Sequence, residues 1–172
     1  MEDPNFWLER WQNNEIGFHS EDVQPALIKH WPILQIAKGA RVFVPLCGKT
    51  LDMAWLSAAG HVVVGSELSP LAVDAFFAER KLTPQTRSQP PFTIKSMGPY
   101  ELWCGDFFAL RKNEINVSTA YDRAALVAMP PNLQPHYAAK MAELLPAGAK
   151  VLLIGLDYDP KEMQGPPFNV PK

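Results

Sequence analysis

Gly48 and Glu67 have the types and spacing of a nucleoside-binding site, since they lie 19 residues apart in the chain. In dinucleotide sites a glycine turn is followed about 20 residues later by an acidic residue that accepts hydrogen bonds from ribose hydroxyls. The same geometry serves any ligand that contains adenosine. The pair therefore predicts a site at which a carboxylate binds a ribose.

The residues around this pair predict the elements that would position it. The segment 41–46 is apolar on both faces, which is typical of a strand in a parallel sheet covered by helices. A helix is expected from about Leu51 to Ala59, and Gly60 is placed to end it. The β-branched run 62–64 predicts a second strand that carries Glu67 at its carboxyl edge.

The turn after the first strand argues against a phosphate-containing ligand. It holds one glycine, Gly48, where the dinucleotide fingerprint has three, so close approach of a pyrophosphate is poorly supported. The residues 48–50 resemble the end of a P-loop, but that motif needs another glycine at the position of Phe43. What remains is a site for an adenosine without phosphates, and the commonest cofactor of that description is S-adenosylmethionine.

Five blocks of the chain resemble the thiopurine S-methyltransferase family in its bacterial form. They are Trp7-x3-Trp11 with Gly17-Phe18-His19, then 44–49, 64–69, 121–126 and 165–168. The blocks occur in the right order and span essentially the whole chain. The resemblance implies a Rossmann-like fold, S-adenosyl-L-methionine as cofactor and S-adenosyl-L-homocysteine as product. It implies methyl transfer to the sulfur of thiopurines or other heterocyclic thiols.

The same resemblance implies roles for individual residues. Those expected to bind the cofactor are Trp7, Trp11, Leu46, Gly48, Glu67, Leu68, Asp106, Phe107 and Arg123. Those expected to bind the acceptor are Phe18, Arg123, Pro167 and Phe168. Without the resemblance, Asp106 would be interpreted as a helix cap and Phe107 as a core residue.

The first 18 residues contain four aromatic side chains. Trp7 and Trp11 are four residues apart, so on a helix they share a face. Spacing alone favours a hydrophobic stripe that docks this helix on the domain. The resemblance implies that residues 1–22 form a lid over the cofactor, with Phe18 facing the acceptor.

Arg123 is the candidate catalytic residue. It follows Asp122 at the end of a predicted strand, where an ion pair between the two or an interaction with a helix end is the plain alternative. The resemblance places Arg123 at the cofactor and acceptor end of the site, where we expect it to favour an anionic acceptor. An aromatic thiol is already partly ionised near neutral pH, so positioning matters more than a general base. The chain has no evident catalytic triad or metal-ligand spacing, and its four histidines are expected at the surface or as caps.

The remaining pattern continues the alternation of helix and strand. We expect a helix from 69 to 81 that buries Leu71, Val73, Phe76 and Phe77, a loop over 83–91, and further strands and helices at 92–95, 100–104, 120–122, 133–145 and 150–156. This order predicts an α/β fold, a Rossmann-like doubly wound sheet with helices on both faces, in a single domain over 1–172. Compared with the family, the chain is expected to lack the final C-terminal strand pair, which would leave an exposed sheet edge.

Bulk properties restrict the partners. The net charge is −2, from 16 basic and 18 acidic residues without a basic block, so we expect a small-molecule substrate and no nucleic acid. No apolar run approaches the ~20 residues that cross a bilayer, so no membrane partner is expected. Cys47 and Cys104 are expected to be reduced thiols in a cytoplasmic protein, which we expect to be a monomer.

Three further interpretations stay open at the level of sequence. Bacterial members of the family are associated with selenium and tellurium compounds, so the resemblance also suggests metalloid detoxification. A nicotinamide-dependent reductase could use the same strand, helix and strand, although the single glycine disfavours it. A non-catalytic cofactor-binding module is the third alternative, because the final strand pair is expected to be missing.

Overall fold

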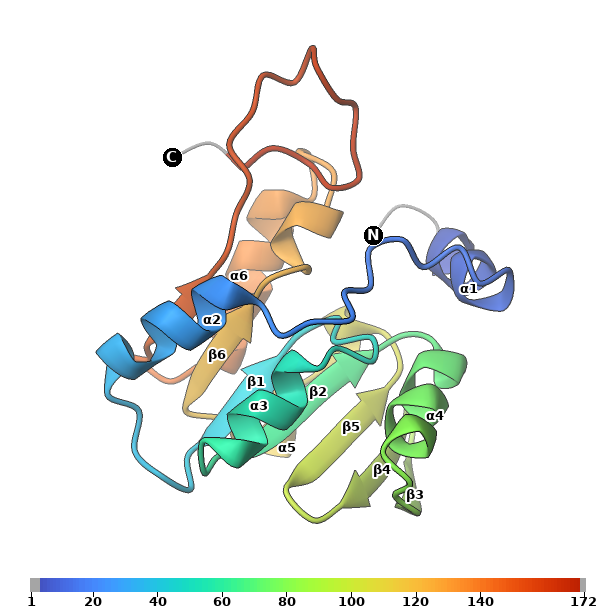
Figure 1. Cartoon of the computed structure of the whole chain (residues 1–172), viewed down its shortest axis with the longest axis vertical. Coiled ribbons are helices and arrows are strands. Elements are labelled where there is room, and N and C mark those ends of the chain that lie inside the picture. The colour runs from blue at the N-terminus through green and yellow to red at the C-terminus, as the bar shows by residue number, and fades with distance from the viewer. Residues whose placement is uncertain (1–3, 171–172) are drawn as a thin grey trace.

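The computed structural model describes residues 4–170, and its centre is a seven-stranded sheet of order β3-β4-β5-β2-β1-β6-β7 (Figure 1). Five neighbouring strands run parallel, with β1 next to β2 and β6, β2 next to β5, and β6 next to β7. Their bounds are Arg41–Val44 for β1, Val62–Glu67 for β2, Tyr100–Cys104 for β5, Thr119–Asp122 for β6 and Val151–Leu153 for β7. The predicted doubly wound α/β fold is confirmed.

An antiparallel hairpin extends one side of the sheet. β4 spans Phe92–Met97 and pairs with β5, and β3 spans Gln85–Gln89 and pairs with β4. The prediction of a loop over 83–91 is therefore wrong. All five residues of β3 are polar and four are exposed, because an edge strand has no buried face that would produce an alternating pattern.

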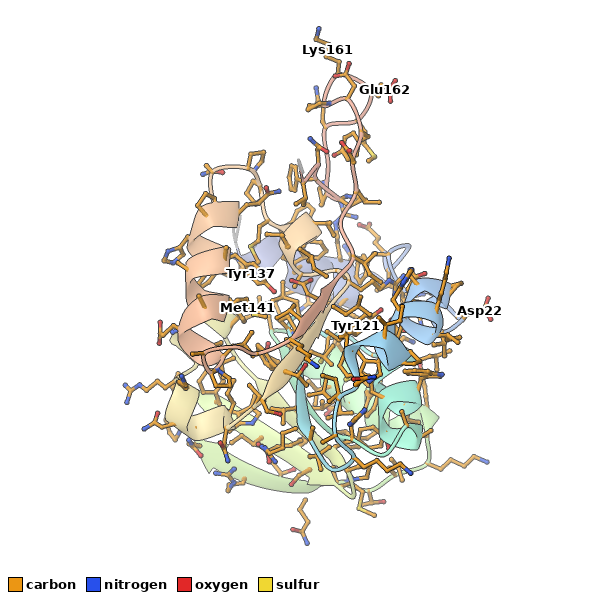
Figure 2. The ribbon with its side chains drawn as sticks, turned by 90° about the vertical axis from the view of Figure 1, so that its left-hand side faces the viewer. Asp22, Tyr121, Tyr137, Met141, Lys161 and Glu162 are labelled. Carbon is orange, nitrogen blue, oxygen red and sulfur yellow. The ribbon has the colours of Figure 1, made fainter. Side chains whose placement is uncertain are left out.

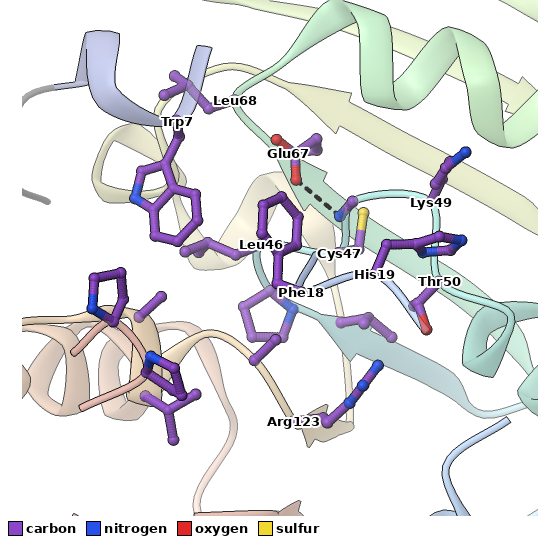
Figure 3. A pocket seen from close by; sticks show the side chains of 18 of the residues that line it. Trp7, Phe18, His19, Leu46, Cys47, Lys49, Thr50, Glu67, Leu68 and Arg123 are labelled. Carbon is purple, nitrogen blue, oxygen red and sulfur yellow. Dashed lines mark hydrogen bonds between the residues drawn. The ribbon is translucent and has the colours of Figure 1, made fainter. Parts of the chain in front are cut away.

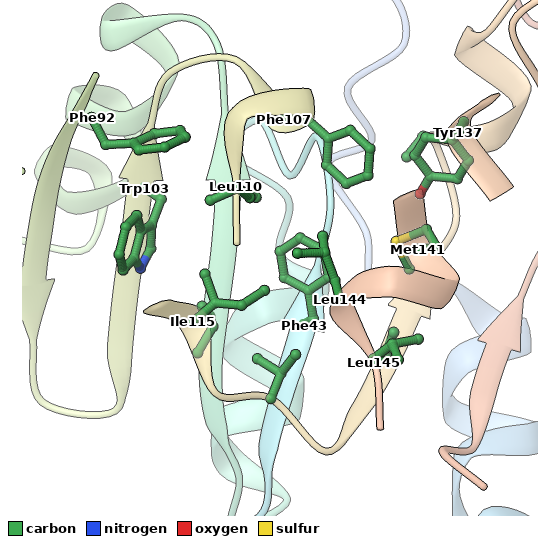
Figure 4. Close-up of a cluster of buried hydrophobic side chains, with 14 of the residues drawn as sticks. Phe43, Phe92, Trp103, Phe107, Leu110, Ile115, Tyr137, Met141, Leu144 and Leu145 are labelled. Atoms are coloured by element: carbon green, nitrogen blue, oxygen red, sulfur yellow. The ribbon is translucent and has the colours of Figure 1, made fainter. Parts of the chain in front are cut away.

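Helices cover both faces of the sheet. On one face lie α2 (Pro25–His30), the 3₁₀ turn η1 (Trp31–Leu34), α3 (Asp52–Ala58) and α4 (Pro70–Glu79). Their buried side chains, such as Leu27, Leu56 and Phe76, form one apolar cluster. On the opposite face lie α5 (Lys112–Ile115) and α6 (Gln134–Leu144), with the 3₁₀ turns η2 (Phe107–Ala109) and η3 (Leu126–Ala128). Figure 4 shows the second cluster, where Tyr137 and Met141 of α6 pack toward Phe43 and Phe107.

Local sequence signals explain where α3 ends and where α4 begins. Gly60 follows α3 with φ of 98°, a conformation that glycine adopts without a steric penalty. α4 begins at Pro70 after the N-cap Ser69, whose hydroxyl accepts a hydrogen bond from the Ala72 amide. Leu71 was expected on the buried face of α4 but is 50% exposed; the neighbouring Ala72 is buried instead.

The two ends of the described chain lie at the same end of the sheet. α1 (Pro4–Gln12) stands beyond the carboxyl ends of the strands, near the start of α4, as Figure 1 shows. After β7, residues 154–170 leave the sheet as a long loop, whose tip at Lys161 and Glu162 extends away from the body (Figure 2). This loop returns through hydrogen bonds from the Val170 amide to Leu156 O and from the Phe168 amide to Val127 O.

β7 forms one edge of the sheet as far as residues 4–170 describe it. The strand is shorter than the predicted 150–156, because the chain turns away after the Ile154 amide donates to Asp122 O. The side chains of Val151 and Leu153 are about two-fifths exposed there. Within the same residues, no helix has both the length and the apolar character needed to cross a membrane.

Candidate functional site

A cavity of about 730 Å³ lies at the carboxyl ends of β1, β2 and β6 (Figure 3). In doubly wound sheets, ligands bind in the crevice outside these strand ends. Five parts of the chain line the cavity: α1 with the segment after it, the turns after β1 and β2, the turn after β5, the turn after β6, and the loop 154–167. Residues that are distant in sequence therefore meet at one edge of the sheet.

Glu67 joins the turns that follow β1 and β2. One carboxylate oxygen accepts a hydrogen bond from the Gly48 amide and the other accepts one from the Ser69 amide, each at 2.8 Å. The side chain is 7% exposed. Burial raises the pKa of Glu67, while the bonds from Ser69 and Gly48 oppose that shift. Each oxygen can still accept a second hydrogen bond, so the carboxylate can bind hydroxyl groups in the cavity.

Cys47 lies in the turn after β1, and its side chain is buried. Its sulfur lies 2.7 Å from the position that a Cβ on Gly65 would occupy, so only glycine fits at that point of β2. Burial raises the pKa of the Cys47 thiol well above its usual value, and the charge of Glu67 adds to the effect. The thiol is therefore a packing group and not an activated nucleophile.

Three aromatic rings close one side of the cavity. Trp7 and Trp11 of α1 each contact Phe18 edge to face, with centroid distances of 5.5 and 5.7 Å. Trp11 also lies on the turn after β1, because a Cβ on Gly48 would come within 3.2 Å of its ring. The expectation that Trp7 and Trp11 share a helix face is confirmed, and all three rings line the cavity.

Other predicted site residues divide into two groups. Leu46, Leu68, Phe107 and Pro167 line the cavity, and Phe107 is also buried in the core. Asp106 and Phe168 do not belong to the lining. The Asp106 carboxylate accepts from the Phe108 amide at 3.0 Å and is the N-cap of η2, which is the helix-cap alternative.

Arg123 lines the cavity, but its acidic partner differs from the one considered from sequence. Arg123 Nη1 lies 3.9 Å from Asp52 Oδ2. Asp122 instead accepts hydrogen bonds from the amides of Ala125 and Leu126 and from the Tyr137 hydroxyl. The proposed Asp122–Arg123 ion pair is therefore replaced by a contact with a residue 71 positions earlier in the chain.

Sequence reasoning missed several residues of the cavity lining, among them His19, Lys49, Asp52 and Tyr121. His19 was expected at the surface or as a cap. Burial lowers its pKa and the charge of Lys49 adds to that shift, so a neutral imidazole is favoured near pH 7. The sequence signal that could have identified His19 as a site residue is its place in the Gly17-Phe18-His19 block. Among residues 4–170, no group of three His, Cys, Asp or Glu side chains is placed to hold a metal ion.

Comparison with known proteins places this geometry among methyltransferases. A thiopurine S-methyltransferase family profile matches residues 2–172. The chain is 50% identical over 168 residues to the thiopurine S-methyltransferase of Pseudomonas fluorescens strain Pf0-1, covering 97% of this chain and 77% of that relative. It is 51% identical over 169 residues to the enzyme of that name from Xanthomonas campestris pv. campestris strain 8004, with coverages of 98% and 78%.

A solved structure supports the same fold at lower identity. Burkholderia thailandensis 1,6-didemethyltoxoflavin-N1-methyltransferase, determined with 1,6-didemethyltoxoflavin and S-adenosylhomocysteine, aligns with a TM-score of 0.66 and 17% identity. The alignment covers 91% of this chain and 62% of that one. At this identity the likeness concerns the fold alone.

Proposed function

We propose that this chain, which belongs to the thiopurine S-methyltransferase family, transfers a methyl group to the sulfur of a thiopurine or a related heterocyclic thiol. S-adenosylmethionine is the cofactor of the family and therefore of this methyltransferase. When bound, it supplies an electrophilic methyl group on a sulfonium. The nicotinamide-dependent alternative has no support from the family.

The residues on one side of the cavity fit this cofactor. The buried Glu67 carboxylate retains acceptor capacity at the end of β2, where a ribose diol would meet it. Gly48, with φ of 52°, lets the backbone turn closely beneath the ligand. We therefore assign Glu67 to the ribose, and Trp7 and Trp11 to the cover over the methionine part. Asp106, which caps η2, leaves the adenine to Leu68 and Phe107 in this proposal.

The single observation that carries the acceptor assignment is the position of Arg123 in the same cavity as Glu67, with Phe18 between them in the view of Figure 3. A guanidinium attracts an anionic acceptor, and a thiolate is the reactive form of a thiol. Phe18 offers a ring face or edge to a planar heterocycle. Arg123, Phe18 and Pro167 would thus orient the acceptor sulfur, without moving a proton.

The reaction needs alignment more than acid or base chemistry. Holding two reactants in a productive geometry lowers a barrier by up to about 7–11 kcal/mol. In this proposal the rings of Trp7, Trp11 and Phe18, which pack on one another along the cavity wall, keep water from the reacting atoms when the ligands are bound. In this proposal the protein contributes position, exclusion of water and a cation near the thiolate.

Product analysis would test the proposal. We would incubate the chain with S-adenosylmethionine and mercaptopurine, and use hypoxanthine, which carries oxygen in place of the sulfur, as the matched control. We expect S-adenosylhomocysteine and S-methylated product to form with the thiol only. Binding of S-adenosylhomocysteine without methylation of any thiol would favour a non-catalytic module. An aromatic selenol in a parallel reaction tests whether the activity extends to selenium compounds, as the family resemblance suggests.

A further inference from the structure

We infer that Asp52 is a positioning residue that sets the location of the Arg123 guanidinium in the acceptor half of the cavity. The inference rests on the proposed role of Arg123 at the acceptor. It extends that role to a residue that no sequence motif singled out.

Asp52 begins α3 and is fully buried, although it lines the cavity. An ionised carboxylate in such a place is tolerated only when hydrogen bonds and an opposite charge compensate for the loss of water. At most helix N-termini an acidic residue in the first turn is exposed and interacts with the helix dipole. The complete burial of Asp52 therefore indicates a more specific role.

Two donors from distant segments fix the Asp52 carboxylate. The Gln24 amide donates to Oδ1 and the Tyr121 hydroxyl donates to Oδ2, each at 2.8 Å. Burial raises the pKa of Tyr121, and the charge of Asp52 adds to the shift, so the phenol stays protonated and donates. Because each oxygen has its own donor, the carboxylate has little freedom to rotate.

The fixed Oδ2 of Asp52 faces the guanidinium of Arg123. Their separation of 3.9 Å is within ion-pair range but longer than a hydrogen bond. Asp52 thus attracts the guanidinium without taking up one of its N–H donors. Those donors remain available to an acceptor in the cavity, while the charge of Asp52 determines where the guanidinium is located.

The Gln24 bond gives the same carboxylate a second connection. Gln24 is the N-cap of α2 and lies six residues after Phe18 in the chain. Asp52 therefore links the base of the aromatic segment to the turn after β6. The acceptor would be held between Phe18 and Arg123. Asp52 would fix the distance between these two residues through its contacts with Gln24 and Arg123.

A double-mutant cycle separates positioning from a structural role. Asp52→Asn preserves the shape, and its amide can still accept from Gln24, but it removes the charge that faces Arg123. Acting through Arg123, it should lower kcat/KM for mercaptopurine about tenfold in the wild-type background and less than about twofold in Arg123→Ala. Asp74→Asn, on the exposed face of α4, is the matched control and should change neither value.

The outcomes distinguish the inference from the proposed function. Equal losses from Asp52→Asn in both backgrounds, while Arg123→Ala alone is impaired, would overturn the positioning role and leave the acceptor assignment standing. Undiminished turnover of Arg123→Ala would overturn both. If Asp52→Asn does not fold, Tyr121→Phe takes its place in the cycle. This substitution removes one donor to the Asp52 carboxylate but retains the negative charge. Its effect on kcat/KM should also disappear in the Arg123→Ala background.

Discussion

On the cofactor side of the cavity a carboxylate joins the backbone amides of two neighbouring turns, whereas on the acceptor side a carboxylate joins groups from segments far apart in the chain. On the cofactor side, Glu67 binds the amides of Gly48 and Ser69, which follow neighbouring strands. On the acceptor side, Asp52 connects Gln24, Tyr121 and Arg123. We therefore expect that a change on the acceptor side leaves the geometry of the cofactor side intact. A change on the cofactor side, by contrast, should also disturb the acceptor side.

Glu67→Ala should have the largest effect. It removes the proposed ribose acceptor and leaves two amides without their partner, each at a cost of about 1–3 kcal/mol. We expect calorimetric affinity for S-adenosylhomocysteine to fall at least about 100-fold, since bonds to a charged group contribute about 1.5–3 kcal/mol each. The thermal midpoint should fall as well. Titration with NADH should give no binding in either form.

Glu143→Ala is the control for this change, because Glu143 is exposed on α6. It should bind S-adenosylhomocysteine like the wild type. Unchanged affinity in Glu67→Ala would remove the ribose assignment and, with it, the distinction between the two sides.

Arg123→Ala should have the next largest effect, restricted to the acceptor side. Loss of a charged donor should lower kcat/KM for mercaptopurine about 10- to 100-fold, from a contribution of about 1.5–3 kcal/mol. The side chain is partly exposed, and its ion pair with Asp52 is long, so the thermal midpoint should change little. Steady-state kinetics and thermal unfolding, measured on one preparation, check the loss of kcat/KM and the unchanged thermal midpoint. Parallel losses of stability and turnover would refute an acceptor role.

Trp11→Leu should have a smaller effect that depends on the charge of the ligand. An aromatic face near a sulfonium contributes about 0.5–2 kcal/mol, which corresponds to an affinity loss of about 2- to 30-fold. The loss should be greater for S-adenosylmethionine than for S-adenosylhomocysteine, which carries no sulfonium. Competition titrations of the two ligands measure the ratio. An equal loss for both would indicate that Trp11 acts only by packing on Phe18 and the turn at Gly48.

Acidification should produce the smallest effect, and it should act oppositely on binding and stability. Burial raises the folded-state pKa of Glu67 above its ordinary value of 4.5. The corresponding stability is fully present below that ordinary value and is lost as the pH rises through the folded pKa. Affinity for S-adenosylhomocysteine should instead decrease as the pH falls through the folded pKa, because a protonated carboxyl accepts fewer hydrogen bonds.

Glu67→Gln isolates this titration from that of other carboxyls such as Asp122, whose pKa is also raised by burial. Its affinity should depend less on pH than that of the wild type between neutral pH and the ordinary range of exposed carboxylates. The same pH dependence in both forms would assign the effect to another group.

The cofactor side could be predicted from sequence because its information is local. The apolar strand 41–44, the helix 52–58 and the β-branched run before Glu67 occupy consecutive residues, and each has a recognisable pattern. Their order determines that Gly48 and Glu67 meet at one sheet edge. By contrast, β3 was missed because its polar residues resemble a loop until pairing with β4 satisfies their backbone groups.

The acceptor side could be predicted only in part, because its contacts cross long stretches of chain. Asp52 meets Gln24 and Tyr121 across 28 and 69 residues, and no spacing rule relates such positions. Asp106 shows the opposite difficulty, since the family resemblance implied a cofactor role whereas the local pattern implied a helix cap. In the structure its Oδ1 accepts from the Phe108 amide, as the cap pattern predicts, and the residue lies outside the cavity lining.

The position of the Glu67 carboxylate determines when the free-energy cost of burying its charge is incurred. Its water is removed and its orientation is set when the strands assemble, because the amides of Gly48 and Ser69 already occupy both oxygens. Most of the cost of burying this charge is thus borne during folding, and in the proposed ribose role an arriving nucleoside would meet an acceptor that is already oriented. If Glu67 binds the ribose as proposed, selection of a diol would require no rearrangement of this carboxylate.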